Sequence, residues 1–144
     1  MNEINVRGDG FNLTLGIAGY ERERSGETYD DNWLRGAATL DLAQPPCATF
    51  MARCDVAWQT TDLLRFQEGL RTLLDDLSGV AALSTVEDQV ELIIRLTNGK
   101  GTIEGRLQAH AIASLEFEAT TDQSFLTQTM AELRGVNSAY PFRR

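Results

Sequence analysis

Histidine and cysteine are scarce in this chain of 144 residues, which has one histidine, His110, and two cysteines, Cys47 and Cys54. The spacing of the cysteines fits neither a Cys-x-x-Cys redox pair nor a paired zinc knuckle. One histidine is too few to complete a tetrahedral metal site with them. We therefore expect no metal and no cofactor, and we interpret Cys54, on the apolar side of its segment, as a small buried side chain.

Basic residues are few as well: 13 lysines and arginines stand against 21 aspartates and glutamates, so the net charge is −8. Phosphate backbones repel such a chain, which argues against a protein that binds nucleic acid. An acidic surface suits a basic protein partner, although solubility alone would also account for it.

Long apolar runs are missing too. No stretch approaches the length of a membrane span, and residues 1–5 have neither a basic flank nor an apolar run. We therefore expect a cytoplasmic protein without membrane contact. The content of 42% hydrophobic and 24% charged residues is that of an ordinary globular protein. A chain of this length can bury one continuous core, so we predict a single domain over residues 1–144.

Alternating apolar and polar residues dominate the sequence, and this period of two predicts half-buried antiparallel strands. The expected strands cover residues 4–6, 11–17, 34–42, 50–58, 90–96, 103–111 and 115–119, with a weaker one at 80–83. The period directs the side chains of Phe50 and Trp58 toward the core. Asn98-Gly99 is the strongest short signal for a hairpin turn, so the strands that flank it are expected to pair.

A helical period replaces the alternation after Thr60 and Thr61, either of which can cap a helix. The apolar stripe of this helix runs from Leu63 to Leu77, and Gly79 stands where a left-handed stop is expected. The helix is long and amphipathic, so one face can pack against a sheet.

A second helix is expected to begin after Thr121-Asp122 and to end before Gly135. This order of elements predicts the α+β class, with a curved antiparallel sheet of about seven or eight strands packed on one long amphipathic helix, plus a C-terminal helix. A curved sheet around a helix can enclose a ligand cavity, although the leucine-rich stripe more simply fills that space.

No set of residues points to catalysis. His110 is expected on the side of its strand away from the core, which favours an exposed histidine over a member of a catalytic triad. Neighbouring carboxylates can run glycoside chemistry, but none of the pairs is distinctive. These pairs are Asp30-Asp31, Asp75-Asp76, Glu87-Asp88 and Glu116 with Glu118. We therefore predict no catalytic residue and no enzyme.

Acidic side chains and one tryptophan are the candidates for contact with a basic protein partner. Trp33 points opposite to Leu34 by register, so it is either an exposed contact residue or covered by a loop or helix. The predicted partner-binding residues are Asp30, Asp31, Trp33, Asp75, Asp76, Glu104, Glu116 and Glu118. A structural domain that forms a homo-oligomer through an apolar face is a further possibility.

Two separated motifs resemble those of the WapI-type immunity proteins. Residues 29–34, Tyr-Asp-Asp-Asn-Trp-Leu, resemble an early Asp-x-Asn-Trp-Leu signature, and residues 121–126, Thr-Asp-Gln-Ser-Phe-Leu, resemble a late Asp-Gln-Ser-Tyr/Phe-Leu signature. Residues 139–143 are similar to the aromatic-proline tail of the family, so the resemblance covers most of the chain. It implies a small cytoplasmic antitoxin that binds and blocks the C-terminal domain of a toxin delivered by a neighbouring bacterial cell. In the namesake system this toxin domain is a tRNA-cleaving nuclease.

Such an antitoxin needs no catalytic residue, and its acidity would suit a basic nuclease groove. Every member would need the turn and the anchored tryptophan, so we expect residues 29–33 to hold the shared fold more than to contact a variable toxin. The alternative is a small-ligand-binding protein, or an unrecognised enzyme, with a cavity between sheet and helix.

Overall fold

The computed structural model describes residues 2–44, 48–109 and 112–144, so His110, Cys47 and the Pro45-Pro46 turn lie outside the described residues. The elements in chain order are β1 (Asn2–Gly8), β2 (Phe11–Tyr20), α1 (Thr28–Asp31), β3 (Trp33–Gln44), β4 (Ala48–Gln59), α2 (Thr60–Asp76), β5 (Gly79–Ser84), β6 (Val90–Thr97), β7 (Lys100–Ala109), β8 (Ala113–Asp122) and α3 (Gln123–Ala139). This architecture confirms the predicted α+β class, the long helix and the C-terminal helix.

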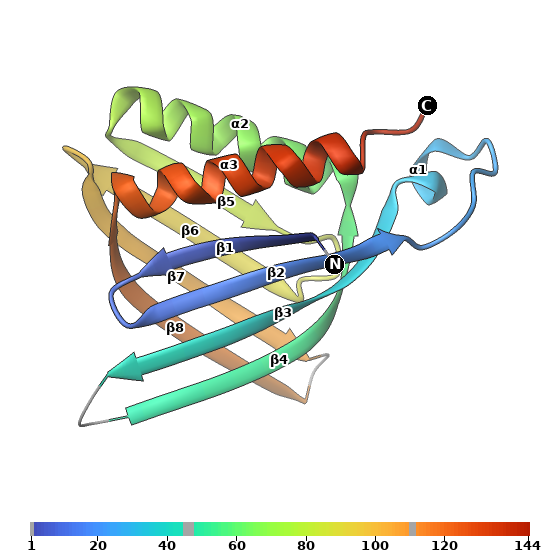
Figure 1. The fold of residues 1–144 in the computed structure, drawn as a ribbon. Coiled ribbons are helices and arrows are strands. Elements are labelled where there is room, and N and C mark those ends of the chain that lie inside the picture. The colour runs from blue at the N-terminus through green and yellow to red at the C-terminus, as the bar shows by residue number, and fades with distance from the viewer. Residues whose placement is uncertain (1, 45–47, 110–111) are drawn as a thin grey trace.

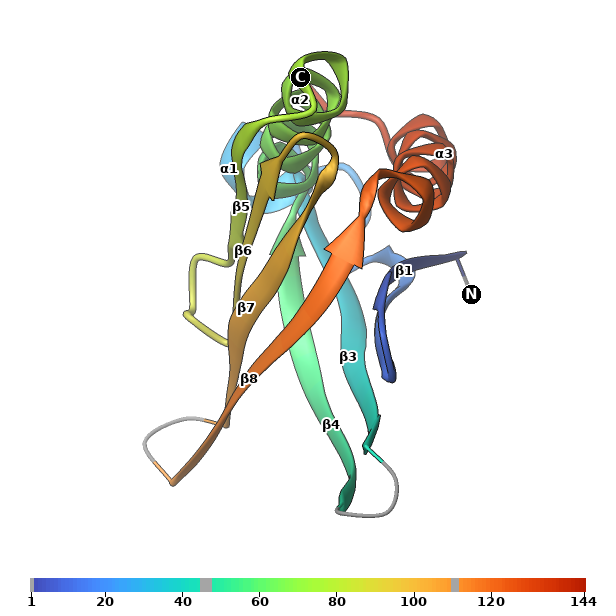
Figure 2. The ribbon, with the colours of Figure 1, turned by 90° about the vertical axis from the view of Figure 1, so that its left-hand side faces the viewer.

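The strands divide into two antiparallel sheets, β1-β2-β3-β4 and β5-β6-β7-β8. The first sheet lies in front of the second in Figure 1, with α2 and α3 in contact with each other above them. The strands of the two sheets cross, and they move apart toward the ends farthest from the helices (Figure 2). Because α2 follows β4 directly, the chain starts a second sheet after the helix instead of extending the first one.

One hydrophobic cluster joins both sheets and both long helices. Trp58 of β4, Phe66 of α2 and Leu133 of α3 are completely buried within it, so the expected inward position of Trp58 is confirmed. Complete burial of a side chain of this kind stabilises the fold by about 1.5–3 kcal/mol. These side chains occupy the space in which the alternative prediction places a ligand cavity.

Side chains of α3 cover the free edge of β1. The backbone N–H of Asn5 donates to Oε1 of Glu132 at 3.1 Å, and the hydroxyl of Thr129 donates to the Asn5 carbonyl at 2.7 Å. The helix thus takes the place of a neighbouring strand and satisfies backbone groups that would otherwise invite pairing with another chain.

The predicted Asn98-Gly99 hairpin is confirmed. Its φ angles are 52° at Asn98 and 80° at Gly99, the two positive values that a tight primed turn requires. The Gly99 N–H donates to the Leu77 carbonyl, and the Gln123 N–H donates to the Gly99 carbonyl, both at 2.8 Å. The turn therefore fixes the end of α2 and the start of α3.

Both ends of α2 differ from the prediction. The N-cap is Gln59, and Thr60 lies inside the helix because its hydroxyl donates to Oδ1 of Asn32 instead of capping. At the other end the left-handed residue is Leu77, with a φ of 54°, and Gly79 already begins β5. The hydrogen bond of Leu77 to the hairpin turn holds the chain in this conformation.

The predicted end of α3 before Gly135 is also wrong, since the helix continues to Ala139. The added turn buries Val136 and lets Nδ2 of Asn137 donate to Oε1 of Gln67 at 2.7 Å. These contacts offset the cost of a glycine inside a helix, which is about 1 kcal/mol.

The prediction that Phe50 points into the core is wrong, since this side chain is 50% exposed. At this end the β3–β4 pair and the β7–β8 pair move apart, as Figure 2 shows. The period of two gives the correct side of the strand there, but the opposing sheet is too far away to cover that side. The result is an apolar groove between the sheets at this end, which Leu42 and Phe50 line.

Candidate partner-binding surface

The predicted contact residues fall into three groups. Asp30, Asp31 and Trp33 belong to α1 and the start of β3, Asp75 and Asp76 end α2, and Glu104, Glu116 and Glu118 lie on β7 and β8. Figure 1 shows α1 and the C-terminal end of α2 at opposite sides of the molecule. The eight residues therefore do not form one continuous surface.

Asp31 is buried and holds the loop before α1. Its carboxylate accepts hydrogen bonds from the Ser25 hydroxyl at 2.7 Å, the Ser25 N–H at 2.8 Å and the Gly26 N–H at 2.9 Å. The Ser25 bonds above all, with the Gly26 bond and the charge of Arg143, hold the pKa of Asp31 below its ordinary value although burial opposes them. The carboxylate of Asp31 is thus engaged within the chain itself.

The neighbouring Trp33 is half-buried and packs its ring edge-to-face against Tyr29, with ring centroids 5.5 Å apart at 85°. Tyr29 is itself mostly exposed. The structure therefore gives Trp33 a local packing partner while part of its ring remains open to solvent.

The other acids near helix ends are solvated. Asp30 forms an ion pair with Arg22 at 3.8 Å, and Asp75 forms one with Arg71 at 3.1 Å. Asp76 is exposed. Exposed pairs of this kind contribute about 0–1 kcal/mol, so none of these residues is needed for the fold.

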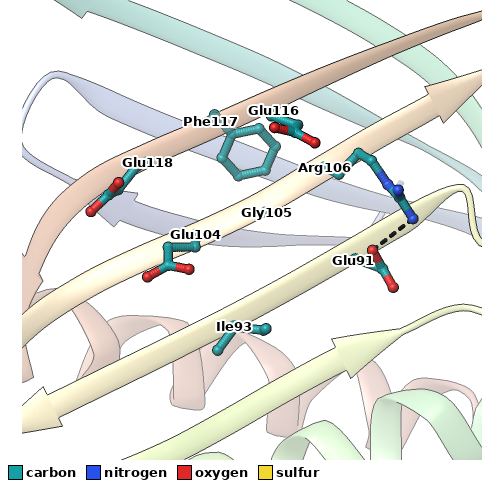
Figure 3. A pocket seen from close by; sticks show the side chains of 8 residues that line it. All are labelled: Glu91, Ile93, Glu104, Gly105, Arg106, Glu116, Phe117 and Glu118. Atoms are coloured by element: carbon teal, nitrogen blue, oxygen red, sulfur yellow. Dashed lines mark ion pairs between the residues drawn. The ribbon is translucent and has the colours of Figure 1, made fainter.

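The third group lies on the outer face of the second sheet, where β6, β7 and β8 align their side chains in rows. One row contains Glu91, Arg106 and Glu116, and the next contains Ile93, Glu104 and Glu118. We call the four glutamates Glu91, Glu104, Glu116 and Glu118 the acidic face. Its side chains surround a shallow hollow of about 470 Å³ (Figure 3).

Two arginines compensate part of this charge. Arg106 pairs with Glu91 at 2.8 Å, and Arg95 pairs with Glu104 at 3.0 Å. Within the described part of the chain, neither Glu116 nor Glu118 has an ion-pair partner. Two exposed and uncompensated carboxylates are therefore open to the positive charges of another molecule.

Glu104 and Glu118 face each other directly across the β7–β8 pair. Like charges in opposite positions destabilise a sheet by about 0.2–1 kcal/mol. Arg95 pairs with Glu104, whereas Glu118 has no ion-pair partner among the described residues.

Glu91, the fourth glutamate of the acidic face, and its ion-pair partner Arg106 are absent from the predicted contact residues. The signal that finds them is the Asn98-Gly99 turn, because a two-residue turn sets the register of the strands that it joins. Counting outward from that turn places Glu91 opposite Arg106, as the structure shows.

Over residues 2–44, 48–109 and 112–144, no group of histidine, cysteine, aspartate and glutamate side chains has an arrangement that could hold a metal ion. Among the helices of the same ranges, none has the length and apolar content to cross a membrane.

Both motifs of the sequence hold junctions of the fold. In the first, Asp31 closes the loop before α1. In the second, Asp122 is the N-cap of α3, and its carboxylate accepts from the N–H groups of Ser124 at 2.9 Å and Phe125 at 3.3 Å. Leu126, the last residue of the motif, is completely buried.

The sequence profile of the immunity protein WapI-like family matches residues 4–141, a range that extends from β1 to the segment after α3 and includes both motifs. The chain belongs to this family. The family resemblance drawn from the two motifs is thereby confirmed. Membership of the WapI-like family supports an immunity function with a toxin protein as the partner, and immunity proteins are generally not enzymes. Searches of curated proteins and of solved structures gave no significant match.

Proposed function

We propose that this WapI-like chain is a cytoplasmic immunity protein that binds a basic toxin domain through its acidic face. The observation that carries the proposal is the pair of uncompensated carboxylates, Glu116 and Glu118, next to Glu104. The net charge of −8 adds attraction at longer range. Complementary charge of this kind speeds association and selects the orientation of the two proteins.

The toxin domain is a nuclease in this proposal. A nuclease groove presents lysine and arginine side chains at the positions of the substrate's phosphates. Carboxylates can accept charge-assisted hydrogen bonds from the same side chains. Glutamates held on a sheet can therefore occupy the groove and exclude the nucleic acid without any catalytic step.

The test uses the C-terminal domain of the large secreted protein that the proposal expects to be encoded next to the gene for this chain. We expect the purified chain to bind that domain with a dissociation constant on the order of micromolar or lower, and to protect tRNA from cleavage by it. Absence of both binding and protection at such concentrations would overturn the proposal.

Two charge-reversed variants locate the surface. Glu116→Lys/Glu118→Lys changes the acidic face, and Asp75→Lys/Asp76→Lys makes the same change of net charge at the end of α2. We expect the first variant to bind about tenfold more weakly or worse, through slower association, and the second to bind nearly as the natural chain does. Equal losses would assign the effect to net charge alone, and a larger loss in the second variant would place the contact at α2. Circular dichroism verifies that both variants fold.

A further inference from the structure

The edge of β8 that faces away from β7 is covered only in part. Near its C-terminal end, β8 meets the turn between β1 and β2, where the Asp9 N–H donates to the Thr120 carbonyl at 2.9 Å. The close approach requires Gly8, because a Cβ atom there would lie 2.2 Å from the Thr120 oxygen. The first sheet therefore covers β8 at Thr120.

The hydrogen bond of Asp9 also shows which backbone groups of β8 point outward. The N–H and C=O of each residue in an antiparallel strand point to the same side, and the side alternates along the chain. The backbone N–H and C=O of Thr120 point away from β7. The backbone groups of Glu118, Glu116 and Ser114 therefore point away from β7 as well. Among the described residues, none donates to or accepts from these outward backbone groups, so this part of β8 is a free edge.

An apolar groove of about 210 Å³ borders the free edge, between β8 and the β3–β4 pair. Leu42, Phe50 and Leu115 contribute its apolar lining, and Glu116 and Glu118 stand at its margin. Unpaired backbone groups, an apolar groove on one side and carboxylates on the other thus occur together along one strand.

We propose that an extended segment of the toxin domain pairs with this free edge and becomes a fifth strand of the second sheet. The inference rests on the proposed function, because it names the segment of the toxin that the immunity protein would hold. Backbone hydrogen bonds to Ser114, Glu116 and Glu118 supply part of the affinity, and alternate side chains supply the specificity. Side chains on one face of the added strand are basic and contact the glutamates, while those on the other face are apolar and enter the groove.

A second copy of this chain does not suit the same edge. Pairing of β8 with another β8 would bring Glu116 and Glu118 close to the same residues of the copy, and like charges across a strand pair repel each other. Charged side chains on an edge strand prevent such self-association. The same charges attract a strand that carries lysine or arginine.

Amide hydrogen exchange of the natural chain, free and in complex with the toxin domain, tests this pairing directly. We expect the amides of Glu116 and Glu118 to exchange at least about tenfold more slowly in the complex, because each becomes hydrogen-bonded. The matched control is the free edge of β4. The Ala57 N–H points away from β3, since it donates to Oε1 of Gln89. By the same alternation, the backbone N–H groups of Arg53 and Asp55 also point away from β3. The exchange of these two amides should stay unchanged.

Proline substitution separates the backbone contact from the charge. Glu118→Pro removes the outward N–H without breaking the pairing to β7, and Glu118→Gln removes the same charge but keeps the N–H. We expect Glu118→Pro to bind the toxin domain up to about tenfold more weakly than Glu118→Gln. If Glu118→Pro fails to fold, the exchange measurement decides alone.

Unchanged exchange at Glu116 and Glu118 in a saturated complex would overturn strand addition and leave the proposed immunity function intact. Protection of the β4 amides instead would move the contact to the other sheet. Failure of the natural chain to bind the toxin domain would overturn the proposed function, and the strand addition with it. Formation of dimers by the free chain that protect Glu116 and Glu118 would identify the edge as a contact between copies and also overturn the inference.

Discussion

The side-chain amide of Asn32 pairs with the backbone of Arg143 as a neighbouring strand would. Nδ2 of Asn32 donates to the Arg143 carbonyl, and Oδ1 accepts from the Arg143 N–H, both at 2.8 Å. The same amide accepts from the Thr60 hydroxyl at 2.8 Å and donates to the Thr28 carbonyl at 2.6 Å. One buried side chain of the first motif therefore joins α1, the start of α2 and the C-terminal tail.

Replacement of Asn32 by alanine should destabilise the chain by about 2–4 kcal/mol, because several buried partners would lose their hydrogen bonds together. The matched control is Asn137→Ala, which removes a partly buried amide with fewer partners and should cost about 1 kcal/mol. Urea unfolding measures both losses. Equal losses would contradict the central role of Asn32.

The stability that Asp31 contributes should depend on pH. Its pKa lies below the ordinary value of 3.8, so the folded state favours the ionised carboxylate. The contribution is therefore complete above that ordinary value and is lost as the pH falls through the lowered pKa. Asp31→Asn should be less stable than the natural chain at neutral pH and should lose less on acidification, as urea midpoints between about pH 7 and pH 3 would show. A parallel decline of both proteins would contradict the assignment.

We expect the acidic face to lower the stability of the free chain although it favours binding of the partner. Glu118→Lys replaces the like-charge pair with Glu104 by an opposite-charge pair, so we expect the free chain to gain about 0.2–1 kcal/mol. Glu116→Lys is the control, because it places a lysine opposite Arg106 and should stabilise nothing. Thermal unfolding of the free chains measures this difference. A loss of stability in Glu118→Lys as large as that in Glu116→Lys would show that the opposed glutamates are not under repulsion.

Two glycines should respond in opposite ways to alanine. Gly8→Ala should destabilise the chain by about 1–3 kcal/mol, because the new Cβ would meet the Thr120 carbonyl and push the β1–β2 turn away from β8. Gly135→Ala meets no atom within 4 Å and should stabilise α3 by up to about 1 kcal/mol. Denaturant midpoints check both changes. A neutral Gly8→Ala would show that the contact between the sheets at this point is loose.

Strands, helices and the tight hairpin could be predicted from the sequence because their signals are local. A period of two or of 3.6 residues is visible over a single segment, and Asn98-Gly99 needs no distant partner to adopt positive φ angles. Alternation also placed Glu104, Glu116 and Glu118 on the outer side of their strands. The two motifs identified the family, and in this chain their residues lie at junctions of the fold.

The ends of the helices could not be predicted from local signals. Thr60 was a good cap by residue type, but its hydroxyl bonds to Asn32, far away in the sequence. Gly135 was a good stop, but Val136 and Asn137 gain contacts with the core and with α2 that outweigh its local preference. In each case a long-range contact is made at or near the position where the local signal predicts the end of the helix.

The sequence by itself determined the class of fold, the family and the side of each strand on which the glutamates lie. Only the tertiary structure decided that the strands form two crossed sheets, that Phe50 lines a groove instead of the core, and that Glu91 joins the acidic face with Arg106 as its ion-pair partner. The physical reason is that periodicity states which way a side chain points along its own strand. Which layer, strand or open edge it then meets depends on how segments distant in the sequence pack against one another.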